Sequence, residues 1–328
     1  MSFRYINPGY GGWFNDASVI TAENNYNYNP EQGISFKKAA SAPEDENKII
    51  LPKAFTTDIY ASFNMYVGNN RPRKFYLGAK KALSSGSEPS IQTSCIGIYI
   101  DSGSVYLLAG ASSNTTGGTI GNYITGLIKN DTLHKIQFHI HRGESAATSF
   151  GEVTINGSTQ IREYSDTNYR NTFGDYNAFY VRFPTTYGEE IYFSNLIVSD
   201  EPISEKEKII KLPISATATD MTAGAGGMYT AATAGQTLLQ TPDITALAQE
   251  FSSESKITGI QVVGNPAYKT STGLETMIGL SKSGTVTTEH GNYTLGTDST
   301  ALVMDGWGLS GVTLDDLSNM QFGWKVAD

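Results

Sequence analysis

The sequence predicts a mainly β protein, with an N-terminal jelly-roll β-sandwich followed by a small α+β domain. Tyr (19), Phe (14) and Gly (34) are abundant, which favours strands joined by tight turns. Residues 57–67 alternate, with Ile59, Phe63 and Met65 on one face and Tyr60 on the other. Strand-like runs of this kind recur roughly every ten to twenty residues up to about residue 200, which is typical of a sandwich.

A change in composition after Pro202 divides the chain. The charged run 204–211 is the first that favours a helix, and Pro213 limits it to a linker or a single turn. The 328 residues suffice for two domains, each with its own core. We therefore expect the sandwich over residues 1–203, a linker over 204–213 and the α+β domain over 214–328.

The last strand of the sandwich is expected over residues 190–200. Its apolar residues change phase across Ser194 and Asn195, as a bulge or bend requires. Loops are expected over 43–48, 84–92 and 112–118. The other expected strands are 33–36, 74–77, 95–100, 105–109, 135–141, 152–155, 159–161 and 178–183.

The second domain is expected to mix short helices with strands. Helices are predicted over 243–251, with Asp243 placed to cap, over 273–280, and over 314–320, with Thr313 as the cap. The expected strands are 214–222, 256–263, 284–288, 301–304 and 321–326.

Composition excludes several classes of function. A formal charge of −9 disfavours nucleic acids and anionic membrane surfaces. A single cysteine, Cys95, excludes an internal disulfide framework and a cysteine-rich zinc site. No apolar run is long enough to span a membrane, so no membrane insertion is expected. Residues 1–8 lack the pattern of a signal peptide, which predicts synthesis in the bacterial cytoplasm without export by that route.

No catalytic residues are predicted. A glycosidase needs two carboxyl groups held about 5–9 Å apart, which on one strand places acids at alternate positions of one face. Glu189 and Glu190 are adjacent and would point to opposite faces, and the acids of 44–46 lie in an expected loop. The glycines of 224–227 are not followed by the Lys-Ser or Lys-Thr of a phosphate loop. These observations favour a protein that is not an enzyme.

Two histidines share a face of the strand 135–141. His139 and His141 would lie about 7 Å apart there, which could in principle hold a metal ion. No acidic residue alternates with them along the strand, and Arg142 adjoins them. The pattern therefore favours polar histidines on the outside of a sheet, with no metal site and no cofactor. A loop-bound Ca²⁺ has no supporting motif and stays open.

Tyrosines gather before the end of the expected sandwich, among Asn, Asp and Thr. Asn, Asp and Thr form hydrogen bonds with sugars, and tyrosine rings stack on the apolar faces of sugar rings. Tyrosines are also common in protein cores and interfaces. The candidate glycan-binding face consists of Tyr164, Tyr169, Tyr176, Tyr180, Tyr187 and Tyr192.

Two resemblances add to this reading. Residues 1–200, closing with the strand 191–200, resemble the concanavalin A-like lectin/glucanase sandwiches, including the laminin-G-like members, although the acid motif of the glucanases is absent. The opening 3–9 and the segments 262–268, 289–291 and 321–324 resemble uncharacterised prophage structural proteins. The second resemblance implies a role in a virion without identifying the part of the particle.

The leading hypothesis is a noncatalytic bacteriophage virion protein on a tail or capsid surface. The sandwich would present a recognition face, and the C-terminal domain would attach it to neighbouring chains. Its expected partners are other virion proteins, further copies of itself and a host surface glycan. The alternatives are a carbohydrate-binding adhesin or module and a glycoside hydrolase or lyase.

Overall fold

The chain forms two compact units, Ser2–Ile210 and Lys211–Asp328, each described here by itself. The boundary falls inside the segment that the sequence predicts to be a linker. No helix among the described residues is both long and apolar enough to cross a membrane. The computed structural model describes residues 4–7, 20–23, 35–38, 45–67, 74–80, 95–101, 103–109, 119–129, 132–164, 176–183, 191–207, 209–210, 212–270, 273–297, 300–303, 307–309 and 311–327.

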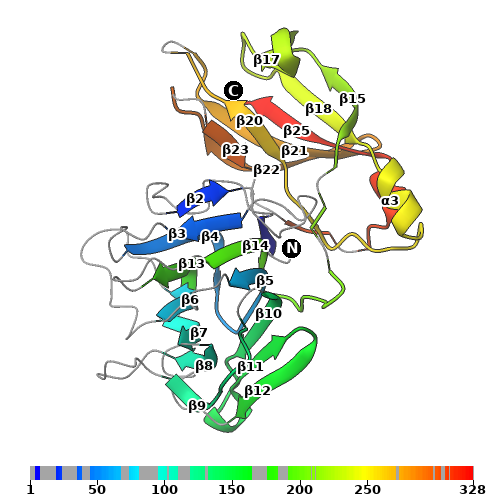
Figure 1. Ribbon diagram of the computed structural model, residues 1–328. Helices are drawn as coiled ribbons and strands as arrows, with labels where there is room; N and C mark the ends of the chain where they lie inside the picture. Colours follow the sequence, from blue (N-terminus) through cyan, green and yellow to red (C-terminus); the bar gives the residue numbers. More distant parts are fainter. Residues whose placement is uncertain are drawn as a thin grey trace. The chain divides into compact units, whose positions relative to one another are not determined.

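The N-terminal unit is built from two six-stranded antiparallel sheets, which Figure 1 shows as two layers. The first sheet has the order β1 (Arg4–Asn7), β14 (Ile191–Ser199), β5 (Asp58–Val67), β10 (Thr132–His141), β11 (Phe150–Ile155), β12 (Ser158–Tyr164). The second has the order β4 (Asp45–Phe55), β13 (Tyr176–Phe183), β6 (Lys74–Lys80), β7 (Cys95–Asp101), β8 (Ser104–Ala109), β9 (Thr119–Ile124). A separate pair joins β2 (Ile20–Glu23) to β3 (Ser35–Lys38), and a short 3₁₀ turn, η2 (Ala146–Thr148), precedes β11.

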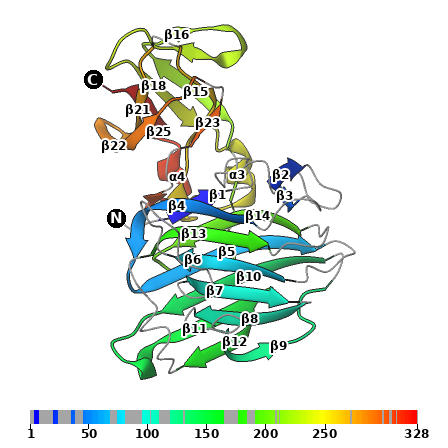
Figure 2. The same cartoon turned by 90° about the vertical axis from the view of Figure 1, so that its left-hand side faces the viewer.

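The core of this unit lies between the two sheets, which overlap in the view of Figure 2. Alternation along β5 buries Ile59 and Phe63, which are 0% and 1% exposed. Along β10 the same period buries Phe138, whose ring stacks on that of Phe179 from β13 with centroids 6.4 Å apart. The predicted alternation is therefore confirmed, and it leaves the even-numbered residues of β5 on the outer face.

The predicted bulge in β14 is also confirmed. The pairing of β14 with β5 shifts register between Ser194 and Ile197. Asn195 inside this interval has φ +53°, the left-handed conformation that Asn tolerates better than most residues. Although β14 is the last strand of the unit in chain order, it lies between β1 and β5.

One expected loop of this unit is a strand. Residues 45–48 belong to β4, an edge strand that pairs with β13 from Asp45 opposite Phe183 onward. Charged side chains suit an edge strand because they discourage pairing with further chains, so the charged composition did not signal a loop here. The expected loops 84–92 and 112–118 lie outside the described residues.

The C-terminal unit is also mainly β, with helices shorter than the predicted α+β domain implied. Its five-stranded sheet has the order β15 (Ile214–Thr219), β18 (Thr237–Pro242), β25 (Met320–Val326), β21 (Thr276–Ser283), β22 (Val286–Thr294). Three strand pairs join β16 (Thr222–Ala223) to β17 (Tyr229–Thr230), β19 (Gly259–Ile260) to β24 (Trp307–Gly308), and β20 (Val263–Ala267) to β23 (Thr300–Val303). Its helices are η3 (Ala225–Gly227), α3 (Thr245–Glu250) and α4 (Leu314–Leu317).

Two predictions for this unit are wrong. The helix expected over 273–280 is instead the strand β21, which is paired on both sides, with β22 and β25. A short apolar run does not distinguish a buried strand from a helix, and the sheet decides. The single strand expected over 256–263 is two shorter strands, β19 and β20.

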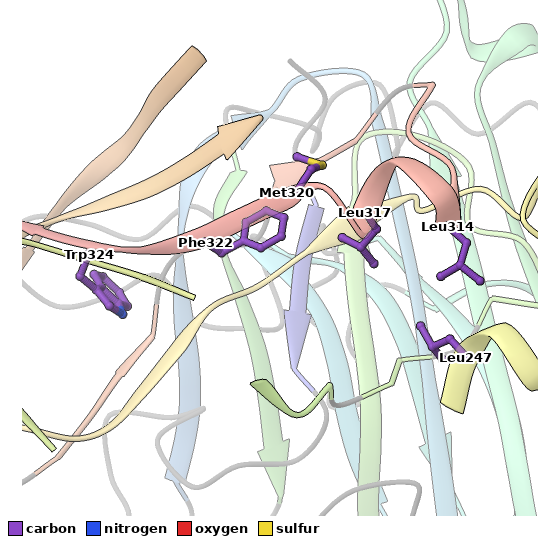
Figure 3. Close-up of a cluster of buried hydrophobic side chains, with 6 residues drawn as sticks. All are labelled: Leu247, Leu314, Leu317, Met320, Phe322 and Trp324. Carbon is purple, nitrogen blue, oxygen red and sulfur yellow. The ribbon is translucent and has the colours of Figure 1, made fainter. Parts of the chain in front are cut away.

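The helices α3 and α4 lie where helices are predicted, but both are shorter than predicted, and the N-cap of α3 is Ile244 and not Asp243. Both helices contribute to the buried cluster of this unit. Figure 3 shows Leu247 of α3 facing Leu314 of α4, with Phe322 and Trp324 following along β25. Thr313 caps α4 as predicted: its side chain accepts the N–H of Asp316, whose carboxylate accepts the N–H of Thr313 in return.

Candidate functional site

The candidate site lies on the outer face of the first sheet, on β5, β10 and β11. Because Ile136, Phe138 and Ile140 point inward, His139 and His141 point outward. Strand pairing places Asp58 of β5 and Phe150 of β11 directly opposite His141. Residues opposite one another in an antiparallel sheet project from the same face, so these side chains meet.

Asp58 joins the two histidines. Its Oδ1 accepts hydrogen bonds from Nε2 of His139 at 2.7 Å and from Nδ1 of His141 at 2.8 Å. The side chains of Asp58, His139 and His141 are 25%, 20% and 28% exposed. We call these three residues the β5–β10 cluster; it is partly shielded yet open to a ligand.

Aromatic rings hold the imidazoles in place. Tyr60 stacks on His139 with ring centroids 3.9 Å apart and an interplanar angle of 17°. Phe150 meets His139 edge-on at 4.9 Å and lies 5.2 Å from His141. Contacts of this kind restrict the rotamers of both histidines, so little further ordering would be needed to bind a ligand.

Electrostatics fix the charge of the site. Partial burial by itself would raise the pKa of Asp58. The hydrogen bonds from His139 and His141 have the larger combined effect, so the pKa of Asp58 is lowered. Burial, together with the negative charges of Asp58 and Glu152, raises the pKa of Tyr60. At neutral pH the site therefore presents a carboxylate beside a protonated tyrosine hydroxyl.

Two other side chains on the outer face of β10 contact the segment that follows β14. Lys135 donates from Nζ to the backbone oxygens of Glu205 and Glu207, the latter at 3.3 Å. Gln137 donates to the backbone oxygen of Ile203 at 3.4 Å. The β5–β10 cluster lies beyond these contacts, toward the C-terminal end of β10.

Sequence reasoning found the histidines and missed Asp58. It looked for an acid alternating with them along β10, whereas the acid comes from the neighbouring strand. Asp58 opens the most clearly alternating strand of the sequence, on the same face as Tyr60. Pairing that strand with 135–141 would have found it, but the pairing was not evident from either strand alone.

The candidate glycan-binding tyrosines that the structure describes do not all lie on one sheet. Tyr176 must be corrected: it is 2% exposed in the core, so its ring cannot stack on a sugar at the surface. Tyr164 and Tyr192 lie on β12 and β14 of the first sheet, separated by three other strands, whereas Tyr180 lies on β13 of the second sheet. Tyr169 and Tyr187 are outside the described residues. The tyrosines are close in sequence because successive strands carry them, but those strands alternate between sheets.

Among the described candidate tyrosines, Tyr164 has a backbone position next to the cluster. It pairs with Phe150, which pairs with His141, which pairs with Asp58. A single row across four neighbouring strands therefore contains Asp58, His141, Phe150 and Tyr164.

His134 has a different environment from the other histidines of β10. It is 2% exposed, its Nε2 accepts the N–H of Lys129 at 3.0 Å, and its Nδ1 has no hydrogen-bond partner. Burial lowers the pKa of His134, and its backbone contact with Lys129 only partly opposes this. His134 therefore binds a proton more readily in the unfolded chain than in the folded one.

We expect His134 to make the N-terminal unit less stable as the pH falls. Below about pH 6.5 the unfolded histidine binds a proton that the folded one resists, so stability is lost from there down to the folded pKa. Replacing His134 with Gln keeps an acceptor and removes the titration, so denaturant unfolding should depend less on pH between about pH 7.5 and pH 5. If the free energy of unfolding changes between these two pH values as much in His134→Gln as in the wild type, His134 is not the group responsible.

Comparison with known proteins finds only distant structural similarities. No protein-family model matches the chain, and no curated protein matches it. Alginate lyase vAL-1 from Chlorella virus is 11% identical, covering 58% of this chain and 94% of its own, with a TM-score of 0.42. The potassium-bound carbohydrate recognition domain of Emp46p is 10% identical, covering 60% and 99%, with a TM-score of 0.40. The globular domain of T. cruzi calreticulin is 9% identical, covering 61% and 84%, with a TM-score of 0.41. These similarities are distant, and neither a family nor an activity is inferred from them.

Proposed function

We propose that this chain is a noncatalytic structural protein of a bacteriophage particle. Its N-terminal sandwich would bind carbohydrate, and its C-terminal unit would attach it to neighbouring virion chains. The resemblance of residues 3–9 and 321–324 to prophage structural proteins supports the virion role. The observation that carries carbohydrate binding is the cross-strand row that ends at Asp58 and Tyr164 on the first sheet.

The chemistry of the cluster suits a sugar ligand. Asp58 carries a charge and can accept hydrogen bonds from two hydroxyls, while the partly exposed rings of Tyr60 and Phe150 offer apolar surface. Such a combination binds a sugar by hydrogen bonds at its edge and by stacking against its C–H face. No reaction is required of these residues in this role.

Carbohydrate binding is tested on a glycan array with the full chain. Tyr60→Ala and Tyr164→Ala, at two positions on the strands of the proposed face, are expected to weaken binding at least about tenfold, the effect of losing roughly 1.4 kcal/mol. Tyr180→Ala is the matched control, since Tyr180 lies on the other sheet of the same sandwich. Equal losses in all three variants, or no glycan bound by the wild type, would count against the proposal.

The virion role has its own test. Particles purified from an induced host should contain this chain in a fixed ratio to the capsid protein, as measured by quantitative mass spectrometry. Deleting residues 214–328 should remove the chain from the particle while leaving the sandwich folded. Finding the chain only in the cytosolic fraction would contradict a structural role.

A lyase or hydrolase is the second candidate, and the pairing of Asp58 with His139 favours it. A carboxylate that orients an imidazole, with a tyrosine hydroxyl in the same patch, is a set of groups able to move protons. Turnover of an acidic polysaccharide that Asp58→Asn abolishes, without loss of folding, would establish this function and replace the noncatalytic one. A panel of uronate-containing polysaccharides, scored by new reducing ends and by ultraviolet absorbance of unsaturated products, provides the assay.

A further inference from the structure

We propose that the β5–β10 cluster is a binding site for a divalent transition-metal ion such as zinc. Asp58, His139 and His141 each offer one ligand atom, and these atoms all lie within 4.8 Å of one another. They come from two strands paired along their full length, so the sheet itself fixes their spacing. The site shares Asp58 with the proposed carbohydrate face, but the metal titrations below contain no sugar, so the two proposals can fail separately.

The donor set selects the class of metal. Two imidazole nitrogens and one carboxylate oxygen suit Zn²⁺, Co²⁺, Ni²⁺ and Cu²⁺. Ca²⁺ and Mg²⁺ prefer six or more oxygen ligands, and this site supplies one carboxylate among nitrogens. We therefore expect zinc or a similar ion to bind and calcium not to compete with it.

The distances are close to those that a tetrahedral ion requires. With metal–ligand bonds of about 2.0–2.1 Å, neighbouring ligand atoms lie roughly 3.3 Å apart. Nε2 of His139 and Nδ1 of His141 are now 2.7 and 2.8 Å from Oδ1 of Asp58, because the carboxylate accepts hydrogen bonds from both rings. An ion would take the place of the two hydrogen-bonding protons, each of which moves through solvent to the other nitrogen of its ring. The ligand atoms would separate by about half an ångström, a shift within reach of small side-chain rotations.

Three protein ligands leave one position of a tetrahedral ion open. The side chains of the cluster are between 20% and 28% exposed, so solvent or a ligand hydroxyl can reach that position. Tyr60 and Phe150 pack against the imidazoles and limit their rotation, which reduces the ordering that binding would require. The site is thus arranged like an open metal centre on the face of a sheet.

The competing explanation is a carboxylate that only accepts hydrogen bonds from two histidines. The two explanations predict different results when the protein is titrated with a metal ion. Full-length protein treated with a chelator and then dialysed is titrated with Zn²⁺ and, separately, with Co²⁺ by isothermal titration calorimetry. The proposal expects one ion per chain and a visible absorption spectrum of tetrahedral Co²⁺, with no heat from Ca²⁺ at the same concentration.

Single-ligand variants locate the ion. Asp58→Asn, His139→Gln and His141→Gln are each expected to weaken Zn²⁺ binding at least about tenfold, since each removes one ligand. His290→Gln is the matched control, because His290 lies in the C-terminal unit with its Nε2 2.6 Å from Oγ of Ser281. Zn²⁺ binding that survives all three cluster variants, or that His290→Gln alone abolishes, would overturn the proposal.

A second measurement is independent of whether the variants fold. The ring nitrogens of His139 and His141 in the wild-type chain are observed by ¹⁵N NMR before and after one equivalent of Zn²⁺. Coordination should shift Nε2 of His139 and Nδ1 of His141 while leaving the rings of His134 and His290 unchanged. Unchanged His139 and His141 resonances at saturating Zn²⁺ would show that the cluster is held by hydrogen bonds alone.

Discussion

Replacing Gly323 with alanine is expected to unfold the C-terminal unit. Gly323 sits in β25 at the centre of the five-stranded sheet, between Leu239 of β18 and Leu280 of β21. A Cβ added there would lie 1.8 Å from the backbone oxygen of Leu238, and the backbone of β18 would have to move to accept it. Moving a strand paired on both sides breaks its hydrogen bonds, so we expect a loss of more than about 4 kcal/mol.

A second glycine of the same unit provides the control. Gly284, in the turn between β21 and β22, has φ +58° and no atom within 4 Å of an added Cβ. Gly284→Ala should cost only the strain of the left-handed conformation, about 1–2 kcal/mol. Hydrogen exchange of peptides from β18, β25 and β21 measures both variants. Similar protection in Gly323→Ala and wild type would show that the sheet can accommodate the methyl group.

The sandwich could be predicted because its strands carry a clear period. Residues alternate along β5 and β10 because one face of each strand is buried and the other faces solvent. The phase change at Asn195 predicted the bulge. The errors have a common cause. Strand β4 is charged and lies at the edge of its sheet, whereas the short apolar run of β21 is a strand paired with β22 and β25. In both cases pairing with other strands decided the structure.

The candidate site shows the same limit. The pattern of β10 identifies His139 and His141 as neighbours on one face, since that relation is local. Their acidic partner is more than eighty residues earlier, and only the register of β5 against β10 brings Asp58 to them. The described candidate tyrosines are separated for the opposite reason: they are close in sequence, but β12, β13 and β14 alternate between the two sheets. Proximity along the chain is a poor guide to a surface built from several strands.

Replacing Phe179 with alanine is expected to destabilise the N-terminal sandwich by about 3–5 kcal/mol, the cost of emptying a buried aromatic site. Phe179 is fully buried and stacks on Phe138, so its ring joins the two sheets across the core. Denaturant unfolding followed by hydrogen exchange of β10 and β13 measures the loss. Phe179→Leu, which keeps most of the apolar volume, should cost clearly less.

Phe179→Ala should also lower the Zn²⁺ affinity of the β5–β10 cluster, although Phe179 is not one of its ligands. Phe138 is the inward neighbour of His139 on β10, and its packing against Phe179 helps to fix the strand that carries both histidines. Where Phe179→Ala remains folded, its Zn²⁺ affinity should fall less than that of His139→Gln, because the ligands remain but are less well ordered. Affinity equal to the wild type would mean that β5 and β11 hold the histidines in place without help from the opposite sheet.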